Sequence, residues 1–403
     1  MKKIGIYTAD LVTPGGSSRK GCLMAERLSA HYDVWLISRG PVDRTLLARN
    51  YGVTLTRVHL LALDEPSGPV ARVLNELLKV FPTHIRSILT QIAPYRRMRR
   101  MHFDLFILNS STYYMRAAAN KSIMMCMFPW PTPNFPRARW CHWPLIKPLI
   151  RTVLGNTLSR DPDAVASYSA ITANSEFTSH WIRQRWNRES RVVYSASETM
   201  PAIAPGKRQK VILMVGRYNW DKQQEVLLDA FRGLTELHEL GWELHFVGRV
   251  HPDSAPYHEQ LLQNAAGIPV QFHYDASAEA LGAFYAQSAM CWNAKGFGIP
   301  ANEPEHLEHF GNTPLEAMAN GCVPVVFDGG GMRETVQQGV NGFRWQTIAE
   351  LQSVTRRLAL DSELLSQISE RGRTIDARFG VTPFLDSVEQ VVADVIGQPP
   401  SPL

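Results

Sequence analysis

Cysteine is scarce in this chain and follows no pattern. The 403 residues include five cysteines, at positions 22, 126, 141, 291 and 322. The number is odd and no two have the spacing of a metal site, so the sequence does not describe a disulfide scaffold or a zinc module. We expect free thiols in the protein core and a reducing compartment.

Long apolar runs are also missing. No uninterrupted apolar stretch reaches the roughly 20 residues of a membrane span. The chain begins with Met1, Lys2 and Lys3, but the apolar run that follows is too short for a signal peptide. These absences predict a cytoplasmic protein whose first segment is a buried strand.

The common phosphate and metal signatures are lacking as well. The sequence contains neither a P-loop nor the G-x-G-x-x-G fingerprint of dinucleotide-binding domains. Asp161-Pro162-Asp163 is an Asp-x-Asp triplet, but it does not stand in a promising loop at the end of a strand. We therefore expect no bound metal and no cofactor.

The chain does have a strong asymmetry of charge. Its formal net charge is +5, but residues 1–200 carry +14 and residues 201–403 carry −9. Together with a length too great for one ordinary core, this indicates two domains with different partners. We predict domains over residues 1–200 and 201–380. A C-terminal helix and tail over 381–403 would follow, with the helix crossing back to the first domain.

Short apolar segments alternate with helical patterns in both halves, as in a parallel sheet covered on both faces. In the first half we expect strands at 3–8, 33–38, 103–109, 122–128, 170–175 and 191–194, and helices at 18–31 and 176–185. After a linker at 195–210, strands are expected at 211–215, 242–247, 270–273, 289–293 and 323–327. Helices are expected at 223–239, 277–287, 314–319, 347–358 and 361–379. The predicted fold class is α/β, with two Rossmann-like domains in tandem and ligands at the carboxyl ends of the strands.

Residues 308–321 form the most informative segment of the chain. Glu308 and Glu316 stand eight positions apart, on either side of a Phe-Gly turn that opens a helix. Such a turn directs backbone N–H groups at an anion and keeps a carboxylate on each side, which suits a nucleotide sugar. A capping box with Thr313 at the N-cap and Glu316 at N3, and Gly321 beyond the last turn, would explain part of the segment. It leaves Glu308 unexplained.

Arg217 and Lys222 follow the first strand of the second half, in a loop that Gly216 allows to turn tightly. An arginine fork can hold two phosphate oxygens, and a lysine adds a mobile point charge. Taken alone, both side chains are more simply explained as solvated surface cations. Glycine-rich turns at 13–18 and 328–334 also allow a close approach of backbone to a ligand, although each is equally an ordinary turn.

The order of these motifs resembles glycosyltransferase family 4, whose members are retaining enzymes with the GT-B fold of two Rossmann-like domains facing across a cleft. The resemblance covers nearly the whole chain and is most specific at residues 308–326. The Glu-His-Phe-Gly wording there is similar to the branch that includes mannosyltransferases of lipid-linked oligosaccharide assembly and many bacterial surface-polysaccharide enzymes.

The resemblance implies a role for each matching residue. Arg217 and Lys222 would neutralise the donor diphosphate, and Glu308 would face the transferring sugar, so these three are the expected catalytic residues. The backbone at the helix start would contact the sugar and the diphosphate. The residues of that start are Phe310, Gly311, Asn312 and Thr313.

The remaining donor contacts implied by the family come from three places. Glu316 would accept hydrogen bonds from the ribose, Gly16 would pass close to the diphosphate, and Tyr274 would line the base, although the match of the last is loose. The chain also departs from the family pattern. Met127 stands where many members have histidine, and Ser17 follows the Gly-Gly turn where an acidic residue is usual, so acceptor recognition does not transfer.

The function expected from these residues is that of a retaining hexosyltransferase. It would move a hexose, with mannose as the first candidate, from a nucleotide-diphosphate sugar to a glycan or lipid-linked acceptor in surface polysaccharide or glycoconjugate synthesis. Arg217, Lys222 and the helix start would replace a metal in stabilising the leaving diphosphate. GDP-mannose is the preferred donor and UDP-sugars come next.

Other functions remain open at this stage. A nucleotide-sugar epimerase or a sugar phosphorylase could share the architecture, although no phosphate site or cofactor lysine for a phosphorylase is found. A non-catalytic sugar-nucleotide-binding subunit is opposed by the intact set of charged residues and is mildly favoured by Met127.

Three segments of the first half combine basic residues with aromatic ones, at 95–103, 137–151 and 181–186. Such segments suit an anionic membrane surface, which attracts each cation by about 1 kcal/mol. We expect peripheral docking at the inner face of the cytoplasmic membrane, with a solvated basic surface or an anionic soluble acceptor as alternatives. Nucleic acid is not an expected partner, because no recognition motif accompanies the charge.

Overall fold

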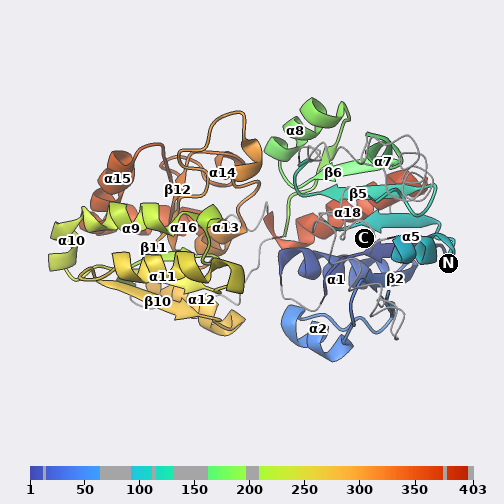
Figure 1. Cartoon of the computed structure of the whole chain (residues 1–403), viewed down its shortest axis with the longest axis horizontal. Coiled ribbons are helices and arrows are strands. Elements are labelled where there is room, and N and C mark those ends of the chain that lie inside the picture. Colours follow the sequence, from blue (N-terminus) through green and yellow to red (C-terminus); the bar gives the residue numbers. More distant parts are fainter. Residues whose placement is uncertain are drawn as a thin grey trace, which may run out of the picture. The chain divides into compact units, whose positions relative to one another are not determined.

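The computed structural model describes residues 1–11, 15–63, 92–110, 115–130, 162–196, 208–374 and 379–397. The chain divides into two compact units, whose elements are labelled in Figure 1. Unit 1 comprises Met1–Asn174, Thr178–Val193 and Leu385–Leu403, and unit 2 comprises Ser175–Phe177 and Tyr194–Phe384. The change of unit after Val193 lies a few residues before the boundary predicted from the sequence, and residues 175–177 group with unit 2 instead of unit 1.

Unit 1 is built on a seven-stranded sheet in which every pair is parallel. The strand order is β3 (Val58–Ala62), β2 (Asp33–Ser38), β1 (Lys3–Tyr7), β4 (Leu105–Leu108), β5 (Ser122–Cys126), β6 (Ala170–Ala173) and β7 (Arg191–Val192). Every strand expected in this half is present. β3 was not predicted, because it is an edge strand in which only Val58 is fully buried, so its apolar signal is weak.

The helices of unit 1 include three that the sequence pattern did not predict. The described helices are α1 (Gly16–Leu28), α2 (Arg44–Tyr51), α5 (Ile92–Arg99), α7 (Pro162–Ala166) and α8 (Glu176–Trp186). α1 begins two residues before the expected start, because Gly15 is extended and serves as the N-cap. α2 and α5 are short and polar, and α7 has only five residues, so they show little apolar periodicity.

The last helix, α18 (Val381–Ile396), packs within unit 1 from Leu385 onwards. Val391 and Val392 lie with Ile107 and Ile123 around the same small cavity over β4 and β5. Arg27 of α1 also donates two hydrogen bonds to the Glu389 carboxylate, at 3.0 Å each. The C-terminal helix is therefore a structural part of the N-terminal unit.

Unit 2 contains a six-stranded sheet, again with every pair parallel. The strand order is β10 (Val270–Tyr274), β9 (Glu243–Gly248), β8 (Gln209–Val215), β11 (Ser288–Asn293), β12 (Val323–Phe327) and β13 (Phe343–Trp345). The chain winds outward from β8 in one direction and from β11 in the other. β8 and β11 therefore flank the topological switch point, outside whose carboxyl ends ligands bind in such sheets.

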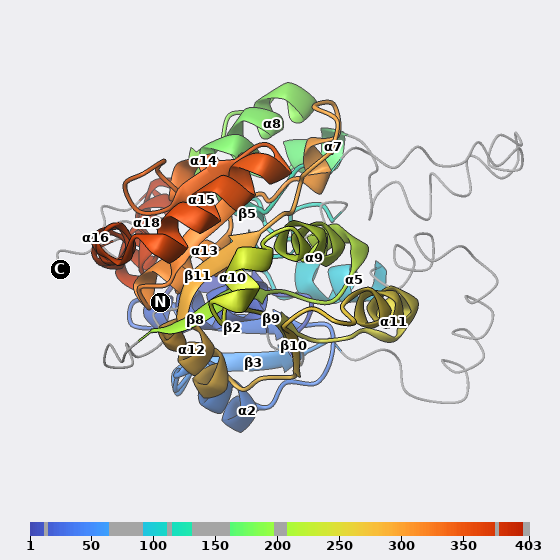
Figure 2. The ribbon, with the colours of Figure 1, turned by 90° about the vertical axis from the view of Figure 1, so that its left-hand side faces the viewer.

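Helices cover both faces of the second sheet, and the alternation of β8 side chains shows which face each covers. Ile212 and Met214 join the core with α9 (Gln224–Arg232), α11 (Ala255–Asn264) and α15 (Ile348–Leu360). Leu213 lies on the other face, with α12 (Ala278–Gln287) and α13 (Asn312–Ala319). Figure 2 shows α9 between α15 and α11, in agreement with the contacts between these helices.

Two expected helices of unit 2 differ from the prediction. The helix expected at 223–239 is divided into α9 and α10 (Thr235–Glu239) at Gly233, which has a low helix propensity and lies against Gln352. The helix expected at 361–379 is shorter in the structure, where α16 covers Ser362–Arg373. In the described part of the chain, no helix has the length and apolar character to cross a membrane.

The packing of α18 gives a stability prediction. Val392→Ala is expected to lower the free energy of unfolding of unit 1 by about 2 kcal/mol, because two buried methyl groups are lost and the strands cannot close the gap. Gln390→Ala, at a half-buried position of the same helix in unit 1, is the control and should change little, because its side chain hydrogen-bonds to the exposed Asp394. Urea unfolding measures both, and equal stability of the two variants would show that α18 does not support the sheet.

Candidate active site

Two loops meet at the switch point of the second sheet. The loop after β8 ends in the 3-10 helix η2 (Trp220–Lys222), and the loop after β11 carries Lys295. The Gln223 side chain joins them, since its amide oxygen accepts from Gly296 N–H at 3.1 Å and its amide nitrogen donates to the Phe297 carbonyl at 2.7 Å. The two loops therefore form one fixed arrangement.

Two lysines converge on one carboxylate at this point. Lys222 Nζ lies 3.1 Å from Glu308 Oε2, and Lys295 Nζ lies 4.0 Å from the same oxygen. Lys295 is also 3.4 Å from Asp221 Oδ2. The side chains of Lys222 and Glu308 are 19% exposed and that of Lys295 is 12% exposed, so these charges are only partly screened by water. Lys222 and Glu308, each predicted as a site residue, are thus brought together in an ion pair, with Lys295 as an unpredicted third member.

The charges of this cluster shift the acidity of its groups. Burial raises the pKa of Glu308, but Lys222, Lys295 and His309 more than offset it and lower the pKa to about 2. Burial, with help from Lys295, lowers the pKa of His309 to about 4. At neutral pH Glu308 is therefore a carboxylate and His309 is uncharged, and His309 Nε2 donates a hydrogen bond to the Glu305 carbonyl, 3.1 Å away.

The loop that carries Glu308 packs against the glycines that follow β12. Gly331 N–H donates to the Glu308 carbonyl at 2.8 Å. A Cβ atom at Gly330 would lie 2.1 Å from that same oxygen, and one at Gly331 would lie 2.3 Å from the His309 carbonyl. The glycine turn at 328–334 therefore allows a close approach of the protein's own backbone, and this is what positions Glu308.

Helix α13 begins two residues before the predicted capping box would place it. Its N-cap is Gly311, at φ 93°, and no side chain caps it. The capping box of Thr313 and Glu316 is therefore wrong, because both residues lie inside the helix. At the other end Gly321 has φ 71°, and the Gly321 and Cys322 amides close the helix on Met318 and Ala317. This end agrees with the sequence prediction.

The side chains of α13 show two further features. Glu316 Oε2 accepts a hydrogen bond of 2.9 Å from the hydroxyl of Tyr285, a fully buried residue of α12. Burial raises the pKa of the Tyr285 hydroxyl well above its ordinary value. The Asn312 side-chain oxygen is buried and has no hydrogen-bond partner among the described residues. Phe310 itself is buried in the core of this unit, so only its backbone is placed at the helix start.

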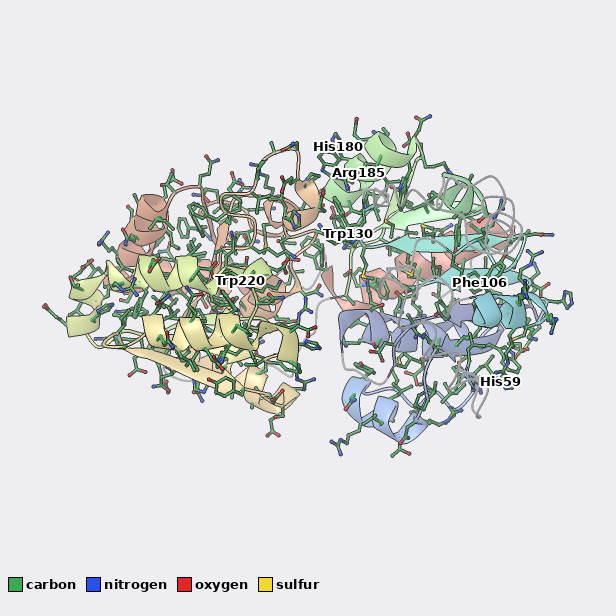
Figure 3. All side chains as sticks on the ribbon, viewed as in Figure 1. His59, Phe106, Trp130, His180, Arg185 and Trp220 are labelled. Atoms are coloured by element: carbon green, nitrogen blue, oxygen red, sulfur yellow. The ribbon has the colours of Figure 1, made fainter. Side chains whose placement is uncertain are left out.

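Arg217 and Tyr274 lie apart from the ion pairs. Arg217 is exposed, and in the described part of the chain its side chain forms no ion pair or hydrogen bond. Trp220, labelled in Figure 3, is 62% exposed and packs on Tyr257 at 4.5 Å between ring centroids. Tyr274 ends the edge strand β10, and its ring lies 5.7 Å from that of Tyr218, which follows β8.

Two predicted positions belong to unit 1. Gly16 is the first residue of α1, and Met127 follows β5, where its carbonyl accepts from Thr178 at 3.2 Å. Residues 16–18 of the turn predicted at 13–18 are the first residues of α1, and residues 12–14 lie outside the described residues. The diphosphate contact of Gly16 stays a prediction.

Sequence reasoning missed Lys295, Asp221 and Tyr285. Lys295 had a usable signal, because it follows a predicted strand and precedes a Gly-Phe-Gly turn. Tyr285 had none, since it reads as an ordinary core residue of its helix. Among the residues that the structure describes, no three His, Cys, Asp or Glu side chains gather as a metal ligand set.

The comparisons with known proteins agree with this geometry. Residues 196–375 match the family model of the glycosyl transferases group 1. The α-1,3/1,6-mannosyltransferase alg-2 of Neurospora crassa is 24% identical over 64% of this chain, and the match spans 65% of that protein.

Solved structures share the fold of the whole chain. Sucrose-phosphate synthase of Thermosynechococcus elongatus aligns with 98% of this chain and 100% of its own, with a TM-score of 0.69 and 15% identity. Anabaena HepE, in complex with UDP and glucose, aligns with 98% of this chain over 100% of its own length. Its TM-score is 0.63 and its sequence identity is 15%. WaaG, a glycosyltransferase involved in lipopolysaccharide biosynthesis, covers 96% of this chain and 99% of its own, at a TM-score of 0.65 and 11% identity.

The chain thus has the GT-B fold of two Rossmann-like units. Residues 196–375, which make up most of unit 2, match the glycosyl transferases group 1 family.

The low pKa of Glu308 predicts how the stability of this unit depends on pH. The ordinary pKa of the group is 4.5 and the folded value is about 2, so its ion pairs stabilise the fold above about pH 4.5 and lose their effect as pH falls toward 2. Glu308→Gln should therefore lower Tm at neutral pH, and the difference from the unchanged protein should stay constant down to about pH 5 and shrink below it. Thermal unfolding across this range measures it.

Glu303→Gln is the matched control, because Glu303 is exposed on the same loop. It should leave Tm nearly unchanged at each pH. A Tm difference for Glu308→Gln that persists undiminished at about pH 3.5 would contradict the role of the carboxylate charge.

Proposed function

We propose that this protein is a retaining hexosyltransferase that uses a nucleotide-diphosphate sugar and does not require a metal ion. The observation that carries the proposal is the pairing of Glu308 with Lys222 at the switch point of the second sheet, 3.1 Å apart. A carboxylate beside a lysine at this place suits a ligand in which hydroxyl groups adjoin a diphosphate.

The diphosphate would be held by positive groups from two elements. Lys222 and the exposed Arg217 lie on the loop after β8, where an arginine fork can grip two phosphate oxygens. The start of α13 has no side-chain cap, so the amides of Asn312 and Thr313 are suitable donors to an anion, aided by the helix dipole. Together they would stabilise the charge that gathers on the leaving group.

The transferring sugar would lie against Glu308, and the ribose against Glu316. The buried Asn312 oxygen lacks a partner in the described residues and would accept a sugar hydroxyl. Tyr285 holds Glu316 through a hydrogen bond of 2.9 Å, which orients the carboxylate for hydroxyl donors. The aromatic cluster that ends in Tyr274 would line the base, and Gly16 would approach the diphosphate from unit 1.

The relatives support a choice of donor and acceptor. The Neurospora crassa relative is named as a mannosyltransferase, which favours mannose and hence a GDP-sugar. The HepE structure contains UDP and glucose, which keeps UDP-sugars as the second candidates. WaaG acts in lipopolysaccharide biosynthesis, which favours a glycan or lipid-linked glycan acceptor.

The mechanism follows from the placement of charge. The bond between the anomeric carbon and the diphosphate oxygen breaks, the acceptor oxygen bonds to the same face of that carbon, and the hydroxyl proton passes to the leaving diphosphate, so the configuration is retained. Lys222, Arg217 and the helix start take up the negative charge of the diphosphate, and Glu308 favours the positive charge developing on the sugar. The amides at the start of α13 act without solvent reorganisation, because the helix has already fixed them.

An assay of donor turnover tests the proposal. The purified protein is incubated with a panel of GDP-, UDP- and ADP-sugars in EDTA, and released nucleoside diphosphate is measured. Turnover is expected with at least one donor, and Glu308→Gln should reduce it by at least about 100-fold, the range for a preorganised catalytic group. Glu303→Gln is the control and should keep normal turnover.

Each remaining outcome would change the proposal. Near-normal turnover by Glu308→Gln would remove Glu308 from the mechanism, and full dependence on added Mg²⁺ or Mn²⁺ would contradict the metal-free claim. Conversion of the donor sugar to its epimer, without transfer or hydrolysis, would indicate an epimerase. Inversion at the anomeric carbon, read by NMR of the glycosylated product, would contradict retention.

We also propose that unit 1 docks on an anionic membrane through α5. Arg96, Arg99 and Arg100 at its end are exposed, whereas Tyr95 and Met98 are buried beneath them. The segment at 181–186 is engaged within the protein instead, because Arg185 stacks on Trp181 and Phe128. The segment at 137–151 lies outside the described residues.

Sedimentation with liposomes tests the docking. The protein should bind vesicles rich in anionic lipid at low salt, at about 1 kcal/mol for each cation near the surface. The variant Arg96→Gln, Arg99→Gln, Arg100→Gln should lose most of this binding. Neutral vesicles are the control. Equal binding of variant and unchanged protein would assign the contact to another surface.

A further inference from the structure

The ligand-free site contains an ion pair that the proposed function must separate. Lys222 and Glu308 are paired at 3.1 Å, but the first is proposed to bind the diphosphate and the second the sugar. A diphosphate carries more negative charge than a single carboxylate and would attract Lys222 more strongly. Glu308 would then be left as a partly buried carboxylate that has lost its closest counter-ion, which is a costly state for any protein.

Lys295 is placed to prevent this. Its Nζ lies between two carboxylates, 3.4 Å from Asp221 and 4.0 Å from Glu308. A small rotation of the long side chain would bring it into full contact with Glu308. Because Lys222 and Lys295 approach the same oxygen, Oε2, only one of them is needed there at a time.

The backbone around Lys295 is well fixed. Its amide donates to the Asn293 side chain at 3.0 Å, and β11 ends at that residue. Gly296 follows at φ 102°, where a Cβ atom would lie 2.7 Å from Leu307. Phe297 then packs on Trp345, with 5.3 Å between ring centroids. The lysine side chain can therefore move while its attachment to the sheet stays in place.

We infer that Lys295 is the counter-ion that holds Glu308 in place when the donor is bound and so releases Lys222 to the diphosphate. Asp221 is its resting partner. Lys295 is a positioning residue, because it acts on the sugar through Glu308 and does not itself touch the diphosphate. This inference rests on the proposed function and adds a residue to it.

A double-mutant cycle on donor turnover tests the inference. Lys295→Met keeps the unbranched shape and most of the length of the side chain and removes its charge. It should lower kcat by roughly 10- to 100-fold, the range for groups that orient an active residue, with little change in the KM for the donor. Lys295→Arg should restore most of the loss. In a Glu308→Gln background, adding Lys295→Met should lower kcat by less than about threefold, because the Glu308 charge that Lys295 compensates is gone.

The controls separate a charge effect from a loss of fold. Lys210→Met removes an exposed lysine of β8, and turnover should stay normal. Lys295→Gln is the second uncharged variant should Lys295→Met fold poorly, and circular dichroism checks both.

Three outcomes would overturn the inference. They are an undiminished loss for Lys295→Met in the Glu308→Gln background, a rise in KM without a change in kcat, and normal turnover by Lys295→Met. The first two would indicate a direct contact with the diphosphate.

The proposed function can fail separately. If neither GDP nor UDP raises the Tm of the unchanged protein and no donor is turned over, the proposed function fails, and the inference fails with it. If a nucleotide binds and the donor is turned over, the cycle alone decides the role of Lys295.

Discussion

The attraction of two lysines for one carboxylate is the interaction on which the site of unit 2 depends. Lys222 and Lys295 lie in the loops that follow two neighbouring parallel strands, and the Gln223 side chain joins those loops. Glu308 belongs to a long connection and needs a separate support, which the Gly330 and Gly331 backbone provides. Charge alone would not hold these groups together, because their mutual attraction in water is weak. Partial burial strengthens it.

The same arrangement explains why the site suits an anionic ligand. Positive groups from the loops after β8 and β11 outnumber the carboxylates they face, once the exposed Arg217 is included. The start of α13 adds amides that no side chain caps. A ligand that brings its own negative charge would complete the set. This is the physical basis for assigning the chemistry of a glycosyltransferase to unit 2.

Basic residues in unit 1 show how little composition says about the use of a charge. Arg27 of α1 forms an ion pair with Glu389 of the C-terminal helix, and Arg185 stacks on aromatic rings. Arg96, Arg99 and Arg100 at the end of α5 are exposed, whereas the exposed Arg183 of the segment at 181–186 is paired with Glu189. The strong positive charge of the first half is therefore partly structural. The sequence could not separate the two uses, since Glu389 and Phe128 are distant in the chain from the arginines that they contact.

Local patterns were enough to predict most of the parallel strands, because a buried strand is a short apolar run wherever it stands. They were also enough to single out Glu308, which capping could not explain. They failed at β3, whose edge position leaves it little apolar character, and at the start of α13, where Gly311 takes a backbone conformation that displaced the expected cap. Lys295 and Tyr285 depend on the order of strands and on the packing of α12 against α13. Those contacts join residues far apart in the chain, so no local periodicity contains them, and only the tertiary structure could decide them.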